Sequence, residues 1–183
     1  MTILYIIIAV VLIGGFWFIG GYNGFVRLKT RAEEAWADID VQLKRRYDLI
    51  PNLVNSVKGY AKHEEGVFTK VTEARTAAMG ATSMEEHAAS ENMLTGALKS
   101  LFAVSENYPQ LRASENFLHL QHELTDAEDK IQASRRFYNG NVRDFNTKLQ
   151  VFPTNLIAGM FGFKDRDFFD APDEVNEAPQ VSF

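Results

Sequence analysis

The sequence predicts an all-α protein in which an N-terminal transmembrane helix continues into an elongated antiparallel bundle of about four helices. Residues 3–22 contain no charged side chain, and after them apolar residues return at steps of three and four over long stretches. No stretch carries a clear strand signal. We divide the chain into an anchor (1–26), the bundle (27–151), an aromatic segment (152–170) that packs on the bundle or on a partner, and an acidic tail (171–183) expected to be disordered.

The apolar span, residues 3–22, is long enough to cross a bilayer. At ~1.5 Å per residue a helix of this length measures roughly 30 Å, the thickness of the hydrocarbon core. A cleaved signal peptide normally has a basic start, a shorter apolar stretch and small residues at its cleavage site. Here no basic side chain precedes Ile3, and Gly20-Gly21-Tyr22 is a poor cleavage site. We therefore expect the span to be retained as a single-pass anchor that contacts the lipid bilayer.

The charges that follow the span predict its orientation. Arg27, Lys29 and Arg31 come soon after it, and no lysine or arginine precedes it. The positive-inside rule then places the C-terminal domain in the cytoplasm. Gly20 and Gly24 form a GxxxG pair of the kind that lets a second helix approach closely, although glycine is common in spans and Gly24 lies at the membrane edge.

The first bundle helix carries one apolar stripe for about eight turns beyond the span. Pro51 interrupts it, and because a proline deletes one backbone hydrogen bond we expect a kink there and not an end. Gly59 and the Lys62-His63-Glu64 run indicate a break or a second bend. The stripe consists of Ala32, Trp36, Ile39, Leu43, Tyr47, Ile50, Leu53, Val57 and Tyr60.

Three further helices are predicted after the first, two short ones and then a long one. The second runs from Glu64 to Met79 and is closed by Gly80, a residue that readily adopts the left-handed cap conformation. Ser83 and Glu86 form a capping box that opens the third, which ends at Tyr108-Pro109. The fourth runs from about Pro109 to Gln150. The apolar stripe of the second helix is Val67, Val71, Ala74 and Ala78, and that of the third is Leu94, Leu98, Leu101 and Val104. The stripe of the fourth helix is Phe117, Leu120, Leu124, Ala127, Ile131, Ser134, Tyr138, Val142, Phe145 and Leu149.

Composition and motifs exclude several classes of function. The chain has no cysteine, which removes disulfides, thiolate metal sites and cysteine nucleophiles. Its net charge of −5 argues against nucleic acid as a partner, because phosphate binding needs a concentrated basic surface. There is no HExxH, no P-loop, no GxGxxG after a strand and no GxSxG.

The best metal candidate is a set of four residues on the fourth helix, Glu115, His119, His122 and Glu123. The apolar stripe of that helix rotates His119 to one side and His122 nearly to the opposite face. Bundle di-iron sites use Glu-x-x-His motifs from more than one helix, and this chain contains none. We therefore expect solvated histidines, and predict no catalytic, cofactor-binding or metal-ligating residue.

Charged residues on the first and fourth helices are placed to pair across the bundle. Such pairs favour one register between long helices, although exposed pairs add little to stability. We prefer this structural interpretation to acid–base catalysis. The candidates are Asp38, Asp40, Arg45, Arg46 and Asp48 on the first helix, and Glu123, Asp126, Glu128, Arg135 and Arg136 on the fourth.

The aromatic segment after the fourth helix has two interpretations. Its apolar residues either fold back on the bundle, or they dock on a partner or on the bilayer surface. We expect packing within the chain, because protein cores absorb most aromatic residues. The residues concerned are Phe152, Leu156, Ile157, Met160, Phe161 and Phe163.

Several runs of the sequence resemble the LemA family. They are Ala35–Val54, Val57–Tyr60, Glu106–Pro109, Arg135–Asn139, Phe145–Lys148 and Phe152–Asn155, in the expected order and over nearly the whole chain after the span. The resemblance implies a single-pass protein of the bacterial inner membrane with a long-helix antiparallel bundle and no established enzyme activity. It also implies a link to membrane shaping, through a member from magnetosome-forming bacteria. His119 and His122 stand where the family usually shows glutamine-like polar residues.

These observations support two main functional hypotheses. The first is a membrane-anchored, non-catalytic scaffold that self-associates as a homo-oligomer at the bilayer and shapes or organises membrane. The second is an adaptor that presents its bundle face or C-terminal segment to a membrane-protein partner, such as a membrane protease or an envelope-stress system. A bundle metalloenzyme is a more distant third.

Overall fold

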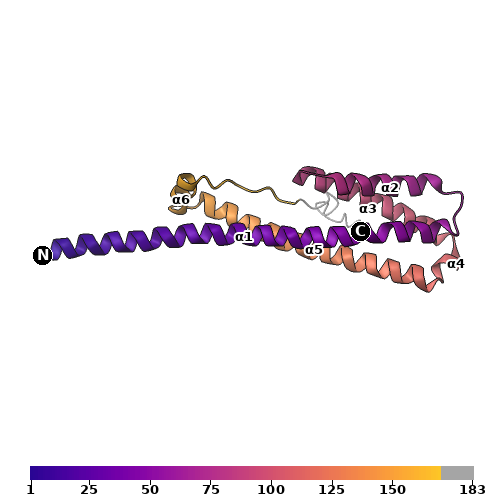
Figure 1. Cartoon of the computed structure of the whole chain (residues 1–183), viewed down its shortest axis with the longest axis horizontal. Coiled ribbons are helices and arrows are strands. Elements are labelled where there is room, and N and C mark those ends of the chain that lie inside the picture. The colour runs from indigo at the N-terminus through magenta and orange to yellow at the C-terminus, as the bar shows by residue number, and fades with distance from the viewer. Residues whose placement is uncertain (170–183) are drawn as a thin grey trace, which may run out of the picture. The chain divides into compact units, whose positions relative to one another are not determined.

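In the computed structural model, which describes residues 1–169, every regular element of the described chain is a helix (Figure 1). The predicted all-α class with a long apolar N-terminal helix is therefore confirmed. The acidic tail, residues 171–183, lies outside the described residues. The helices are α1 (Thr2–Lys58), α2 (Glu65–Gly80), α3 (Met84–Glu106), α4 (Pro109–Arg112), α5 (Glu115–Gln150) and α6 (Thr154–Phe161).

The chain divides into two compact units, and the long helices α1 and α5 contribute a stretch to each. Unit 1 consists of Met1–Asp38 and Ser134–Phe168, and unit 2 of Ile39–Ala133 together with Phe169, the last described residue. We describe each unit by itself.

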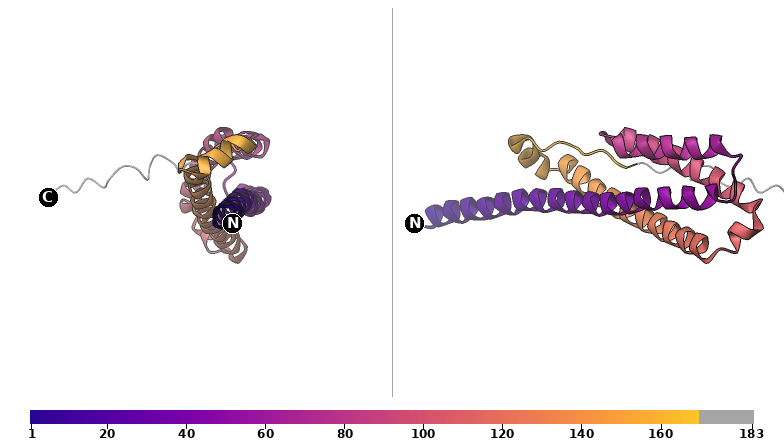
Figure 2. Two further views of the ribbon diagram at one scale, coloured as in Figure 1. Left: turned by 90° about the vertical axis from the view of Figure 1, so that its left-hand side faces the viewer. Right: turned by 45° about the vertical axis from the view of Figure 1, so that its right-hand side comes forward.

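In unit 1 the beginning of α1 and the end of α5 run antiparallel. Trp36 lies beside Tyr138 at 5.6 Å between ring centroids, and Phe25 lies beside Phe145 at 6.1 Å. Helix α6 follows α5 and runs across the direction of α1, as both Figure 1 and the end-on view in Figure 2 show. Gly162, with a φ of 69°, ends α6 in the left-handed conformation that glycine adopts without strain.

After α6 the chain returns along α5 in an extended conformation. The side chain of Asn146 accepts a hydrogen bond from the backbone N–H of Arg166 (3.0 Å) and donates one to its carbonyl (2.9 Å). The Tyr138 hydroxyl donates to the carbonyl of Asp167 at 3.0 Å. These bonds satisfy backbone groups that no helix or strand would pair, and they hold this segment to α5.

In unit 2 the end of α1 is joined by hydrogen bonds to α2, α3 and the beginning of α5, and α4 packs on α3. Helices α2 and α3 lie side by side as a hairpin (Figure 1). The predicted stripes form most of the buried core, since Ile39, Leu43 and Ile50 of α1, Leu94 of α3 and Leu124 of α5 are all buried. Periodicity at 3.6 residues thus identified the correct face of each long helix.

Helix boundaries agree with the sequence at some points and differ at others. Helix α1 continues through Pro51 and ends before Gly59. The capping box is present, because Ser83 accepts a hydrogen bond from the backbone N–H of Glu86 and Glu86 accepts one from that of Ser83. Gly80 does not adopt the expected left-handed cap, since Ala81 leaves α2 in an extended conformation.

The predicted fourth helix is interrupted near its start. It begins as the short α4, breaks at Ala113 and Ser114, and resumes as α5. Serine is a favoured residue immediately before a helix, and Glu115 places an acidic side chain in the first turn of α5, where it complements the helix dipole. Local capping chemistry therefore starts a new helix where the apolar pattern alone suggests continuity.

Candidate functional site

The four predicted metal candidates do not form a site. Glu115, His119 and His122 are exposed, whereas Glu123 accepts a hydrogen bond from Arg45 at 2.6 Å. Within residues 1–169 there is no group of three histidine, aspartate or glutamate side chains positioned to hold a metal ion.

The most buried charged group of unit 2 is the Arg46 guanidinium, whose side chain is only 2% exposed. It donates hydrogen bonds to Glu91 on α3 and to Glu128 on α5. The Tyr47 hydroxyl donates to the other oxygen of Glu91. Arg75 on α2 donates through Nε to the backbone carbonyl of Tyr47 at 2.7 Å. We call these five residues the buried ion network, and it joins α1, α2, α3 and α5 of unit 2.

The network has a structural and not a catalytic character. Each carboxylate is bonded to a cation or to a hydroxyl within the protein, so none is presented to a cleft as a free acid or base. Burial, followed by the bond to Glu91, raises the pKa of Tyr47, which keeps that hydroxyl protonated and donating. A charge this deeply buried stabilises one arrangement of helices, because any other would leave it unpaired.

Sequence reasoning found part of this network and missed Glu91. The pairing of Arg46 with Glu128 was among the predicted pairs. Glu91 was absent from them, although its spacing of three to Leu94 and seven to Leu98 extends the buried stripe of α3. A carboxylate at a core position needs a buried cation as its partner. Arg46 lies three residues after Leu43 and four before Ile50, so it also falls on the buried stripe of α1.

A second, exposed set of charges joins α1 and α5 within unit 2. Arg45 donates to Glu123 at 2.6 Å and to Asp126 at 3.0 Å, as predicted, and Lys130 donates to Asp126 at 2.9 Å. The hydrogen bond from Arg45 lowers the pKa of Glu123, and the bond from Lys130 is the main cause that lowers the pKa of Asp126. These side chains are solvated, so they help to set register and add little to stability.

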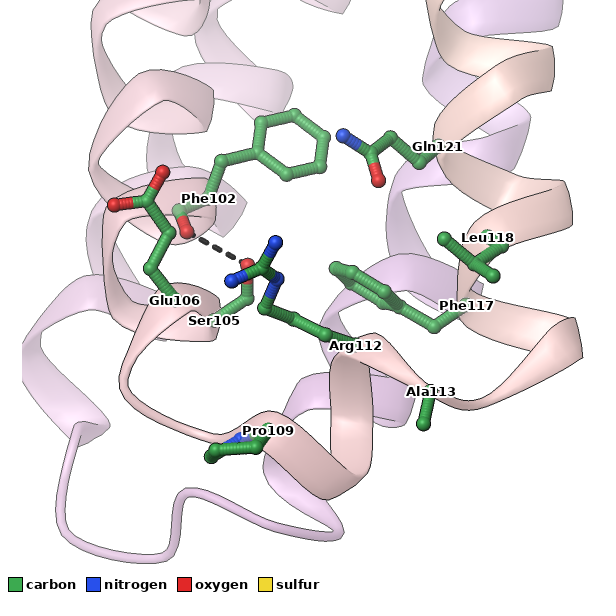
Figure 3. A pocket seen from close by; sticks show the side chains of 9 residues that line it. All are labelled: Phe102, Ser105, Glu106, Pro109, Arg112, Ala113, Phe117, Leu118 and Gln121. Atoms are coloured by element: carbon green, nitrogen blue, oxygen red, sulfur yellow. Dashed lines mark hydrogen bonds between the residues drawn. The ribbon is translucent and has the colours of Figure 1, made fainter.

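Unit 2 also has an open hollow of about 450 Å³ among α3, α4 and the start of α5 (Figure 3). Phe102 and Phe117 line its apolar part, and the Arg112 side chain extends into it in the close-up. Ser105 is on the rim, where its hydroxyl donates to the carbonyl of Phe102 at 2.6 Å. The hollow combines two aromatic rings with a guanidinium, but no nucleophile paired with a base.

In unit 1 the span is the first candidate surface. The apolar part of α1 meets the length and composition requirements of a membrane-crossing helix, and none of its most apolar window is buried within the protein. Large apolar side chains from Ile3 to Ile19 are exposed along it.

The second candidate surface of unit 1 is an aromatic cluster where α6 and the chain after it meet α1 and α5. Phe25, Phe145, Ile157 and Ala158 are buried at its centre. Phe163 stacks on Phe25 at 4.9 Å between ring centroids, and Phe161 lies 4.6 Å from Tyr22. Phe18, Tyr22, Leu28 and Leu149 complete the set, which we call the aromatic cluster.

Two glycines of α1 allow the cluster to approach the helix closely. A Cβ at Gly21 would overlap Ile157 of α6, and one at Gly24 would overlap the end of the Lys148 side chain of α5. In this structure the end of the Lys148 side chain therefore covers Gly24, the second glycine of the GxxxG pair. Nothing lies within 4 Å of Gly20.

Lys148 marks the edge of the aromatic cluster. Its ammonium lies 4.8 Å from the centroid of the Phe25 ring, within the range of a cation–π contact. Burial lowers the pKa of Lys148, and the nearby positive charge of Arg27 lowers it further. The cluster is thus flanked by two cations at the point where α1 leaves the apolar span.

Comparison with known proteins gives consistent matches. The model of the LemA family matches residues 35–183. Protein LemA of Metamycoplasma hominis is 31% identical over 160 residues, which cover 84% of this chain and 72% of the relative. Magnetosome protein MamQ of Magnetospirillum gryphiswaldense and Magnetosome protein MamQ 1 of Paramagnetospirillum magneticum are each 24% identical over 174 residues. This chain spans 64% of the length of each of these two relatives.

Proposed function

The chain belongs to the LemA family, and from that premise we propose that it is a membrane-anchored, non-catalytic scaffold that self-associates at the bilayer and organises or shapes membrane. In this proposal residues 3–22 lie in the bilayer, and the helices that follow form the part that contacts other copies.

The observation that carries the proposal is the continuity of α1. One unbroken helix from Thr2 to Lys58 contains the exposed apolar span and, further along, the buried stripe of unit 2. An exposed apolar surface of this length is far larger than the patches that soluble monomers tolerate, whereas a bilayer would cover it completely.

The engagement of the charged groups supports a non-catalytic role. Arg45, Arg46, Glu91, Glu123 and Glu128 are used in contacts between helices. An active site requires groups that converge on a space for substrate, and these side chains converge on one another.

Self-association is supported by apolar side chains that the described chain leaves exposed beyond the span, among them Val41, Met93 and Phe137. Within the span Gly14 and Gly15 have nothing within 4 Å, and small residues allow membrane helices to approach each other.

Energy transfer in vesicles tests self-association directly. The chain has no cysteine, so a single cysteine at the exposed Lys62, in the loop between α1 and α2, can carry a donor or an acceptor dye. We expect transfer between differently labelled copies to persist as the protein-to-lipid ratio falls. Transfer that vanishes in proportion to dilution, at every lipid composition, would contradict the scaffold proposal.

For location, we propose a single-pass protein of the bacterial inner membrane with the C-terminal domain in the cytoplasm. Arg27, Lys29 and Arg31 after the span support this orientation through the positive-inside rule. A membrane-impermeant maleimide should label a cysteine at Val41 only after the cells are opened. Labelling in intact cells would reverse the orientation.

The hollow in Figure 3 favours a second candidate function, an adaptor for another membrane protein such as a protease or an envelope-stress component. Phe102, Phe117 and Arg112 offer a place for an apolar or acidic side chain of a partner. Pull-down with Arg112→Glu separates the two functions. Loss of a heterologous partner while energy transfer between copies persists would favour the adaptor.

A further inference from the structure

We propose that α6 is a second membrane contact, whose exposed apolar face lies in the headgroup–acyl boundary of the leaflet from which α1 emerges. The inference rests on the proposed bilayer anchoring by α1 and adds to it a shallow helix in one leaflet.

Contacts within unit 1 hold α6 at the end of the span. The Phe161 ring lies 5.8 Å from Phe18 and 4.6 Å from Tyr22 between centroids, and Ile157 packs at Gly21. These three positions of α1 belong to the last turns of residues 3–22. If the span crosses the bilayer, α6 therefore lies at the depth where hydrocarbon gives way to headgroups.

The direction of α6 fits such a position. Figures 1 and 2 show it running across α1, so a span that crosses the bilayer would leave α6 lying along the membrane surface. A helix in this orientation can place one face in the acyl region.

The face of α6 that points away from the cluster is apolar and exposed. Leu156 is 61% exposed and Met160 69%, and Phe152, in the turn that precedes α6, is 74% exposed. The opposite face is buried, since Ile157 and Ala158 pack in the aromatic cluster. Thr154–Phe161 contains no charged residue. A helix that is apolar on both faces is normally covered on both sides.

Continuity with the span identifies the bilayer as the cover. Phe16 and Ile19 of α1 are exposed in the turns that neighbour the α6 contacts, so the apolar surface of α6 extends that of the membrane helix. Arg27 and Lys148 stand beside the aromatic cluster, where they would face lipid phosphates.

Depth-dependent quenching tests this contact in the full chain. Single cysteines at Leu156 and Met160 would carry a small fluorophore in vesicles of phosphatidylcholine and phosphatidylglycerol. A cysteine at Ile7, in the middle of the span, reports anchoring. A cysteine at Phe137 on α5, which is 60% exposed and in the same unit, is the matched control for an exposed apolar position away from α6.

We expect lipids with a shallow nitroxide to quench the labels at Leu156 and Met160, lipids with a deep nitroxide to quench the label at Ile7, and neither to quench the label at Phe137. The double variant Leu156→Glu with Met160→Glu should abolish quenching of a label at Phe152 and leave that at Ile7 unchanged.

The contrary outcomes are distinguishable. The first contrary outcome is nitroxide quenching of the label at Ile7 but no stronger quenching of the labels at Leu156 and Met160 than of the control label at Phe137. This result would overturn the α6 contact and leave the anchoring by α1 intact. If the labels at Leu156 and Met160 are quenched neither by the nitroxide lipids nor by aqueous iodide, a second copy or another protein covers this face of α6. In that case the proposal is wrong. No quenching at Ile7 would overturn the anchoring and the α6 contact together.

Discussion

In both units a stretch of α1 lies against a stretch of α5, but different side chains hold the helices together. In unit 2 the contact is built around charge, with Arg46 buried between Glu91 and Glu128. In unit 1 it is built around rings, with Phe25 between Phe145 and Phe163. The same pair of helices therefore adds directional hydrogen bonds to its apolar stripe in unit 2 and relies on ring packing in unit 1.

The difference indicates what each unit specifies. A buried ion pair penalises every arrangement in which one member lacks its partner, so it selects which helices meet and in which register. Aromatic packing is less directional, but it lets a short helix with no charge, α6, pack closely against Gly21 of α1. In unit 2 the buried ion pairs thus determine which helices meet, whereas in unit 1 the ring packing determines how closely α6 packs on α1.

The largest effect is expected from removing Glu91 in unit 2. Glu91→Ala leaves the Arg46 guanidinium buried with one carboxylate partner fewer, and breaking a buried pair in this way costs about 3–5 kcal/mol. Thermal unfolding in detergent, followed by circular dichroism, should show a clearly lower midpoint. Hydrogen exchange should rise in α3 and in the unit 2 part of α1.

Two further variants sharpen this test. Arg45→Ala removes two partly exposed ion pairs at the neighbouring residue and should lower the midpoint much less, by an amount that salt reduces further. Replacing Arg46, Glu91 and Glu128 together by Met, Leu and Leu should recover most of the loss, because the uncompensated charge disappears. If Glu91→Ala and Arg45→Ala cost the same, the buried network does not specify unit 2.

A smaller and differently located effect is expected in unit 1. Phe163→Ala removes a half-buried ring that stacks on Phe25 and should cost about 2 kcal/mol through lost packing and lost ring contact. Exchange should rise in α6 and at the end of α5. The matched control is Phe168→Ala, an exposed phenylalanine in the same segment. Equal effects of the two variants would show that the stack does not hold α6.

How far the sequence predicts this structure depends on the kind of contact. Apolar periodicity identified the buried faces of the long helices, because a face is a property of one helix alone. Arg45 and Glu123 were among the charged residues expected to pair between the first and fourth helices, but the pattern did not assign individual partners. Glu91 was missed because α3 was read only for its apolar residues, and its partner lies 45 positions away along the chain.

Helix α6 illustrates the remaining limit. Its eight residues are too few for a periodic pattern to stand out, and Pro153 directly precedes it. The closeness of Ile157 to Gly21 and of Lys148 to Gly24 arises from tertiary approach, which no local pattern contains. The GxxxG pair did not identify this approach, because α6 contacts α1 at Gly21, and nothing lies within 4 Å of Gly20.

A smaller effect is expected on the pKa values of two tyrosines, one in each unit. Burial raises the pKa of both Tyr47 in unit 2 and Tyr138 in unit 1, but only Tyr47 donates to a carboxylate. The unfolded chain then loses these protons first, so stability falls as the pH rises above about 10. Glu91→Gln should lower the pKa of Tyr47 and leave Tyr138 unchanged, as measured by tyrosinate absorbance in paired Tyr→Phe variants. A parallel fall at both tyrosines would contradict the difference between the units.

The smallest effect concerns the capping box of α3 in unit 2. Hydrogen bonds from Thr82, and then from Ser83, lower the pKa of Glu86. A lowered carboxyl pKa stabilises the folded state fully above the ordinary glutamate value near 4.5, and this contribution is lost as the pH falls through the lower folded value. Glu86→Gln should therefore remove the acid-dependent rise of hydrogen exchange in the first turn of α3, whereas Glu85→Gln, in the same turn but outside the box, should keep it. Because Glu86 is solvated, the global midpoint should barely move in either variant. An equal loss of acid dependence in both would assign the effect to the helix dipole alone, and the directional bonds of the box would then contribute nothing of their own.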